Sequence, residues 1–239
     1  MGDDALDRAV RALGTMLVTD ARTTDALERV AALADDALPG RAVALSVVGD
    51  GGRPVATVVR GDVAPVVERR QYDDGGGPSV AAYEERRAVV VDDTRQVALR
   101  WPAFAEVAPR HGVLSALALP LGDRGVVVGT LGLYAPAPAA FGPCDAARVG
   151  AFARRAGVVL ANHRAYWDSV DLATRLDRAM ESRAVIEQAK GALMASTGCD
   201  ADEAFEILAK ASQRENVKLR DVARRIVASD HPRGGATAR

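Results

Sequence analysis

Residues able to bind metals or act as nucleophiles are few in this chain and lie far apart. The two cysteines are Cys144 and Cys199, and the three histidines are His111, His163 and His231. No two of them have the short spacing of a metal-binding motif, and at most one disulfide could form. Such sparse cysteine is typical of a reducing compartment. We therefore expect neither a metal centre nor a disulfide framework.

Motifs for catalysis are also missing from the sequence. It contains no G-x-S-x-G, H-E-x-x-H, P-loop or G-x-G-x-x-G pattern. The loop at 75–79 is glycine-rich like a phosphate cradle, but no Lys-Ser/Thr pair follows it, which favours an ordinary loop. Asp92 and Asp93 could hold a metal as paired carboxylates, yet their position before Thr94 favours a turn that caps the next segment. We expect no enzymatic activity.

The cations that could contact phosphate gather towards the C-terminus. Only three of the 31 basic residues are lysine, Lys190, Lys210 and Lys218, and all fall among the last nine basic residues. A lysine ammonium is a compact charge and does not substitute for the planar arginine fork. Lys190 stands beside Gly191, where the missing side chain would let another backbone approach. The pattern fits a phosphate-binding surface or a solvated helix face equally well.

The last helical segment adds further cations on its polar side. The basic residues around it are Arg214, Lys218, Arg220, Arg224 and Arg225. Asp221 is the acid among them, and Lys190 could join the same face. Such a face suits contacts with phosphates, although solvated helices are often as basic.

Composition limits the class of protein. The chain has 239 residues, a mass of 25.0 kDa and a net charge of −1, enough for two small domains and too balanced for a polybasic nucleic-acid coat. Aromatic residues are only 4%, which argues against base-stacking platforms. The N-terminus is acidic and amphipathic, and no apolar run approaches the roughly 20 residues of a membrane span. We expect a soluble, cytoplasmic protein with no membrane partner.

Hydrophobic periodicity predicts an α+β domain first. Apolar residues three and four apart, from Leu6 to Leu17 and from Leu27 to Leu38, predict helices that stop before Pro39. Alternating apolar residues around glycine turns at 49–52 and 122–125 predict two hairpins, and 88–91 reads as a further strand. The expected fold is a central antiparallel sheet flanked by helices.

From Asp145 onward the sequence is helical. Apolar residues follow a seven-residue repeat, interrupted by Asp177, at Val149, Phe152, Ala156, Val159, His163, Tyr166, Val170, Ala173 and Met180. The portion before about Leu160 fits a core helix of the sheet domain. Beyond it a monomer would have nothing to cover the large apolar side chains Tyr166, Trp167, Val170 and Leu176. This predicts a coiled-coil stalk and a homodimer.

Three helices are expected at the C-terminal end. The first ends at Thr197 and Gly198, and Asp200 with Glu203 forms a capping box for the second. A polar turn at 215–216 precedes the third. The predicted core positions are Ile186, Leu193, Ala204, Phe205, Leu208, Ala211, Leu219, Val222, Ala223, Ile226 and Val227.

Residues 183–227 resemble the ANTAR domain, the three-helix RNA-binding module of bacterial antitermination regulators. Its hallmark is present in RAVIEQAKGALM, beginning at Arg183, and matching residues continue to Val227. The resemblance implies binding to paired RNA stem-loops in messenger leaders, which prevents a terminator hairpin from forming. The RNA-binding candidates that we carry over, or place on the basic face, are Arg183, Gln188, Ala189, Lys190, Gly191, Lys218, Arg220 and Arg224.

Much of residues 20–160 is similar to a GAF domain, a sensor fold with a six-stranded sheet flanked by helices. The similarity is carried by GP at 77–78, VVVDDTRQ at 89–96, RWPAFA at 100–105, HGVLSALALPL at 111–121 and VGTLGLYAPAPAAF at 128–141. GAF domains hold diverse small molecules, so a ligand is conceivable here and its identity is unknown. His111 could ligate haem, but its position beside Gly112 favours a turn.

The resulting domain plan has five parts. They are an N-terminal helix at 1–19, a GAF sensor domain at 20–162, a coiled-coil linker at 163–178, an ANTAR RNA-binding domain at 179–229 and a disordered tail at 230–239. We expect a signal-responsive RNA-binding regulator of transcription antitermination. Two alternatives stay open: a helix-turn-helix-like DNA-binding transcription regulator, and a ligand or redox sensor whose output is a protein partner.

Overall fold

A computed structural model describes most of the chain, namely residues 2–16, 23–38, 40, 42–61, 65–123 and 125–229. The chain divides into two compact units, Met1–Trp167 and Asp168–Arg239. The longest helix, α6 (Pro143–Thr197), contributes residues to both units. Leu17 and Pro39 of the predicted N-terminal helices, and the predicted tail at 230–239, lie outside the described residues.

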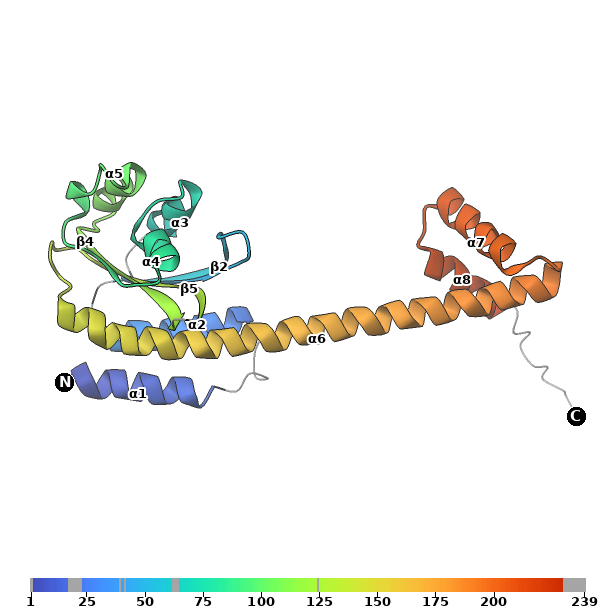
Figure 1. Cartoon of the computed structure of the whole chain (residues 1–239), viewed down its shortest axis with the longest axis horizontal. Coiled ribbons are helices and arrows are strands. Elements are labelled where there is room, and N and C mark those ends of the chain that lie inside the picture. The colour runs from blue at the N-terminus through green and yellow to red at the C-terminus, as the bar shows by residue number, and fades with distance from the viewer. Residues whose placement is uncertain are drawn as a thin grey trace, which may run out of the picture. The chain divides into compact units, whose positions relative to one another are not determined.

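An antiparallel sheet forms the centre of the first unit (Figure 1). Its strands are β1 (Ala42–Val48), β2 (Pro54–Gly61), β3 (Val89–Val91), β4 (Ser115–Asp123) and β5 (Val126–Ala135), in the order β2-β1-β5-β4-β3. The two predicted hairpins, β1–β2 and β4–β5, are confirmed. Over the described residues the sheet has five strands rather than the six that the resemblance implied.

Helices cover both faces of this sheet, as Figure 1 shows. Besides α6 they are α1 (Gly2–Gly14), α2 (Thr23–Ala37), α3 (Pro65–Asp73), α4 (Pro78–Glu85), α5 (Pro102–Arg110) and the short 3-10 helix η1 (Thr94–Gln96). The first part of α6 packs with α1 and α2 on one face, in a core that includes Leu131 and Phe152. The other face carries α3, α4 and α5 over Phe104 and Tyr134. The α+β architecture is as predicted.

Proline marks the start of several of these helices. It is the first residue of α3, α4, α5 and α6. Its fixed φ suits the first helical turn, where its missing N–H would have no intrahelical partner in any case. Helices α3 and α5 were not predicted from the sequence, and α3 supplies Glu68 and Gln71 to a buried polar cluster.

The predicted heptad repeat begins inside the first unit. Val149, Phe152 and Ala156 are fully buried there, as expected for a core helix, and His163 is also fully buried. Further along α6 the large apolar side chains Leu172 and Leu176, which the predicted repeat omitted, are 56% and 57% exposed.

The second unit contains the end of α6 followed by α7 (Ala201–Glu215) and α8 (Leu219–Ser229). The predicted capping box is confirmed, because Asp200 accepts from the Glu203 N–H and the Glu203 carboxylate accepts from the Asp200 N–H. Asn216 ends α7 in the left-handed conformation, which satisfies carbonyl groups of the last turn. The buried core is small: Ala189, Leu208, Val222 and Ala223 form one cluster, and Ala204 is also buried.

One predicted core residue of this unit is not in the core. Phe205 is 45% exposed, whereas its neighbours Ala204 and Leu208 are fully buried. The prediction for Phe205 is wrong because α7 buries only a narrow stripe, and Phe205 lies at its edge. Across the described part of the chain, no helix combines the length and apolar character needed to cross a membrane.

Candidate nucleic-acid interface

Lys190 holds its charge at the surface of the second unit. The side chain is only 17% exposed, yet its Nζ donates to both carboxylate oxygens of Glu187, at 3.3 and 3.1 Å. The aliphatic part of the side chain is therefore covered while the ammonium stays at the surface. Glu187 is exposed and lies one helical turn earlier, so a phosphate could compete with it for the ammonium.

Gly191 follows Lys190 at a position with open space around it. Apart from the adjacent backbone of the helix, no atom of the described residues lies within 4 Å of the place that a Cβ would occupy, and the backbone is that of an ordinary helix. Glycine in a helix interior is unfavourable by about 1 kcal/mol relative to alanine. Packing inside the chain does not require glycine here, which is compatible with the close approach of an external backbone.

Ala189 lies in the core of the second unit and not on its surface. It is fully buried against a cluster that contains Leu208, Val222 and Ala223. The sequence predicts that Ala189 permits the close approach of RNA; its fully buried side chain has no surface for a direct contact. Its small side chain instead allows α7 and α8 to pack closely on α6.

Arg183 and Gln188 are exposed on the same helix. Arg183 precedes Lys190 by two turns, which places the two residues on one face of α6. Gln188 precedes Gly191 by three residues and therefore lies on an adjacent strip of the same helix. These four predicted residues thus form a continuous surface of α6.

Two of the predicted cations around α8 lie near the same acidic side chain, that of Asp221. Arg220 is 35% exposed and lies 3.6 Å from a carboxylate oxygen of Asp221, while its Nε is buried without a hydrogen-bond partner. Arg224 is more exposed and lies 3.8 Å from the same oxygen. Lys218 is exposed, and the described residues offer it no ion-pair partner. One carboxylate therefore offsets part of the charge of this face.

Arg225 faces Glu215 rather than the residues just named. The two side chains form an ion pair, and Arg214 also contacts Glu215, at 3.4 Å. The Arg225 hydrogen bond holds the pKa of Glu215 below its usual value. We therefore exclude Arg225 from the candidate interface, which leaves Lys218, Arg220 and Arg224 as the cations around α8.

The first unit encloses a buried polar cluster that the sequence analysis missed. Glu68 on α3 is fully buried and accepts hydrogen bonds from the Ser46 and Ser79 hydroxyls, both at 3.1 Å, from Gln71 Nε2 at 3.2 Å and from the Tyr134 hydroxyl. Burial raises the pKa of Glu68 above its usual value, although the hydrogen bonds from the Tyr134, Ser46 and Ser79 hydroxyls oppose the rise. The carboxyl is consequently surrounded by partners from the chain itself.

The glycine-rich segment at 75–79 contributes Ser79 to this cluster. The Ser79 N–H donates to Gln71 Oε1 at 2.8 Å, and its hydroxyl binds Glu68. A Cβ at Gly77 would lie 2.4 Å from the Gln71 side chain, so glycine is needed there. These groups bind within the chain, and the predicted loop ends at Gly77 because Pro78 and Ser79 begin α4.

Asp93 and His111, two candidate ligand residues of the sequence, lie at the ends of helices. Asp93 caps η1 and binds Arg95 through two side-chain hydrogen bonds at 2.8 and 2.7 Å, which lowers the pKa of Asp93 to about 2. The predicted capping turn is thus confirmed. His111 ends α5 and is exposed. No group of three or more metal-binding side chains occurs among the residues whose positions are described.

Comparison with known domain families gives two matches. The family model for the GAF domain matches residues 22–160, and the model for the ANTAR domain matches residues 174–227. No curated protein matches the chain.

Solved structures resemble the sheet-containing part of the chain. The GAF domain of a phosphoenolpyruvate-protein phosphotransferase from Coxiella burnetii is 20% identical, with a TM-score of 0.52 over 70% of this chain and 96% of that one. Free methionine-R-sulfoxide reductase from Neisseria meningitidis, solved with its substrate, is 18% identical, with a TM-score of 0.51 over 69% and 91%. At these identities the likeness shows a shared fold and nothing about activity.

Proposed function

Because the chain belongs to the GAF domain family and carries an ANTAR domain after it, we propose that it binds paired RNA stem-loops in messenger leaders and promotes transcription antitermination. The ANTAR domain is an RNA-binding antitermination domain, and the GAF domain is a sensor domain; neither is a catalytic domain. In this proposal the protein works in the cytoplasm without enzymatic activity, and a signal received by the GAF domain modulates RNA binding.

The observation that carries the proposal is the pair Lys190 and Gly191. An ammonium at the surface can bind a phosphate, and the open position beside it lets a nucleic-acid backbone come close. Exposed Arg183 on the same face and Gln188 nearby can add contacts to phosphates or to the bases of a loop. Proteins read RNA sequence mainly in loops, where bases are accessible, rather than in the deep groove of an A-form duplex.

Homodimerisation through α6 is part of the proposal. Two stem-loops would be bound by two ANTAR domains, which a dimer supplies. Support comes from Leu172, Leu176 and Met180, which follow one another at four-residue steps and are all more than half exposed. Large apolar side chains on one helix face are the seam that a second helix covers in a coiled coil.

The central experiment compares two lysine variants of the full chain. Lys190→Ala removes the proposed phosphate contact, and Lys210→Ala is the control, because Lys210 is an exposed lysine of α7 that pairs with Glu206 at 2.9 Å. Binding is followed by fluorescence anisotropy with an RNA that contains two adjacent stem-loops, over a series of salt concentrations. We expect Lys190→Ala to weaken binding about tenfold and to lower the salt slope by about one counterion, with little change for Lys210→Ala. Equal effects of the two variants would remove Lys190 from the interface.

A DNA-binding regulator is the second candidate, because α8 with Arg220 and Arg224 could serve as a basic recognition helix. Competition of the bound RNA with a DNA duplex of equal charge distinguishes the two. Preference for the DNA would overturn the RNA proposal. If neither nucleic acid binds at low salt, a sensor that acts on a protein partner would remain.

A further inference from the structure

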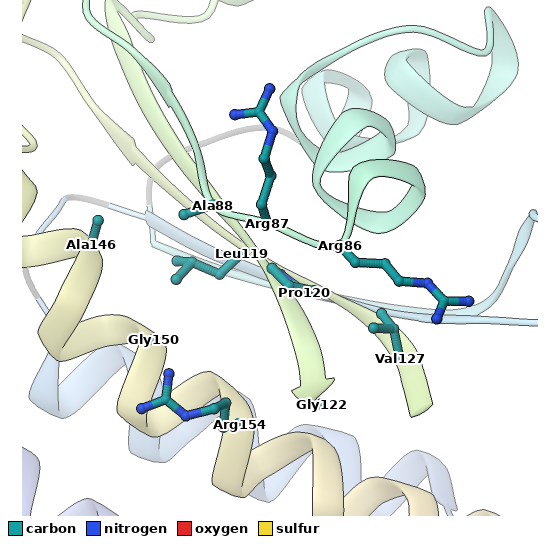
Figure 2. A pocket seen from close by; sticks show the side chains of 10 residues that line it. All are labelled: Arg86, Arg87, Ala88, Leu119, Pro120, Gly122, Val127, Ala146, Gly150 and Arg154. Atoms are coloured by element: carbon teal, nitrogen blue, oxygen red, sulfur yellow. The ribbon is translucent and has the colours of Figure 1, made fainter. Parts of the chain in front are cut away.

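A pocket of about 250 Å³ opens in the first unit beside strand β4 (Figure 2). It arises because β3 pairs only with residues 116–118 of β4, so that among the described strands none flanks β4 from Leu119 onward on that side. The pocket walls include the apolar residues Leu119, Pro120 and Val127. Three arginines also line the pocket: Arg86 and Arg87, which follow α4, and Arg154 from α6.

Two of these arginines lack a partner among the described residues. Arg87 forms an ion pair with Glu85, whereas Arg86 and Arg154 have no ion pair or hydrogen-bonded acceptor for their guanidinium groups in the described part of the chain. Figure 2 shows Arg86 and Arg87 leaving the segment after α4 in different directions, while the Arg154 side chain lies along α6. The pocket thus carries positive charge that the described residues neutralise only in part.

The backbone conformation of Arg86 is unusual for an arginine. Arg86 ends α4 with φ 53° and ψ 36°, in the left-handed region. Glycine or asparagine is usual at such a position, because a side chain there costs free energy. A long cation occupies a site where the fold alone would favour glycine, and an unfavourable residue at a cavity points to a role in binding.

Gly150 supports the same conclusion from the other side of the pocket. A Cβ at this helical position would meet Arg154 Nη1 and Leu119 Cδ2 at 3.5 Å, which is ordinary contact. Packing therefore does not demand glycine, although glycine weakens a helix. Its missing side chain leaves space between the Arg154 guanidinium, which lies back along α6 towards Gly150 in Figure 2, and the apolar wall.

We propose that this pocket binds a small organic anion that carries a phosphate group. Arginine matches phosphate oxygens in two-point hydrogen bonds, and Leu119, Pro120 and Val127 would contact the organic part of the ligand. This inference goes beyond the proposed RNA function and does not depend on it. Arg154 belongs to α6 and Arg86 follows α4, so the two cations reach the pocket from different elements.

The test uses the full chain and inorganic pyrophosphate as the probe. Binding is measured by calorimetry at constant ionic strength, with acetate as a comparison anion. We expect saturable binding of pyrophosphate at a single site per chain, weakened about tenfold by Arg154→Ala and by Arg86→Ala. Arg155→Ala, the matched control, removes the same charge from the next, exposed position of α6 and is expected to leave binding unchanged. Gly150→Leu, which would fill the space beside Leu119, is expected to abolish binding.

Several results would overturn this proposal. They are the absence of saturable pyrophosphate binding, equal losses in Arg154→Ala and Arg155→Ala, and a loss caused by Lys190→Ala instead of Arg154→Ala. If Arg154→Ala weakens RNA binding but not pyrophosphate binding, the surface contacts nucleic acid and the small-molecule site is rejected. Failure of RNA binding in every variant would affect only the proposed function.

Discussion

Gly157 of α6 lies directly against Gly122 near the end of β4. A Cβ at position 157 would stand 2.0 Å from the backbone nitrogen of Gly122 and 2.4 Å from its Cα. Gly122 itself has φ +128°, and a Cβ there would collide with the carbonyl oxygen of Val126 at 2.1 Å. Two glycines thus bring the helix onto the β4–β5 hairpin at backbone contact.

This contact predicts a large effect of one methyl group. Gly157→Ala should lower the free energy of unfolding by about 1–3 kcal/mol, because backbone atoms must move to make room. The helix propensity of alanine alone would raise it by about 1 kcal/mol. Urea unfolding followed by circular dichroism measures the change. Gly150→Ala in the same helix is the control and should be neutral or stabilising, since its Cβ meets only ordinary contacts. Equal stability of the two variants would contradict the close packing.

Gly191 should respond in the opposite way. Gly191→Ala should raise the free energy of unfolding of the second unit by up to about 1 kcal/mol, since nothing within the chain opposes the added methyl group. If a nucleic-acid backbone approaches this position, the same change should weaken RNA binding. Urea unfolding and RNA anisotropy on one preparation test both effects. A variant that is more stable and binds RNA with unchanged affinity would remove Gly191 from the interface.

The parts of the fold that depend on local sequence were predictable. Glycine turns between alternating strands predicted both hairpins, and Asp200 with Glu203 predicted the start of α7, because these signals lie within a few residues of the structure they produce. Phe205 shows the limit of helical periodicity. Positions 204, 205 and 208 share one side of a helix, and only the packing of three helices decides that Phe205 lies at its edge.

The buried cluster around Glu68 and the arginine-lined pocket were not predictable. Glu68 meets Ser46 and Tyr134, which belong to strands distant in the sequence, and a single glutamate on a short helix has no local signature. Likewise Arg86 and Arg154 line one pocket only because α6 packs on the sheet. In the candidate interface the residue types of Lys190 and Gly191 were informative, whereas the burial of Ala189 required the structure.

Glu68 should make stability fall as the pH rises above the usual pKa of a glutamate. Its pKa in the folded protein is raised from 4.5, so the folded state keeps a proton that the unfolded state loses. Between these two pKa values the free energy of unfolding should decrease with pH by up to about 1.4 kcal/mol per unit. Glu68→Gln, which does not titrate, should remove this component.

The measurement is urea unfolding of both proteins between pH 5 and 8. The stability of Glu68→Gln relative to the unsubstituted chain should increase with pH over this interval and level off above the folded-state pKa. A difference that stays constant would show that Glu68 is ionised in the folded protein throughout the range. Glu68→Ala should be destabilised at every pH, because it leaves the Ser46, Ser79 and Tyr134 hydroxyls without their acceptor.

The exposed apolar face of α6 predicts the oligomeric state. Leu172 and Leu176 are exposed in the single chain and would be covered in a coiled-coil dimer. Introducing glutamate at both positions should convert the dimer to a monomer, because like charges would face each other across the apolar seam. Sedimentation velocity at micromolar concentration measures the change. Leu99→Glu is the control, since Leu99 is fully exposed outside α6. If the unsubstituted chain sediments as a monomer, or if the double variant remains a dimer, α6 does not form the seam and paired binding of two stem-loops loses its physical basis.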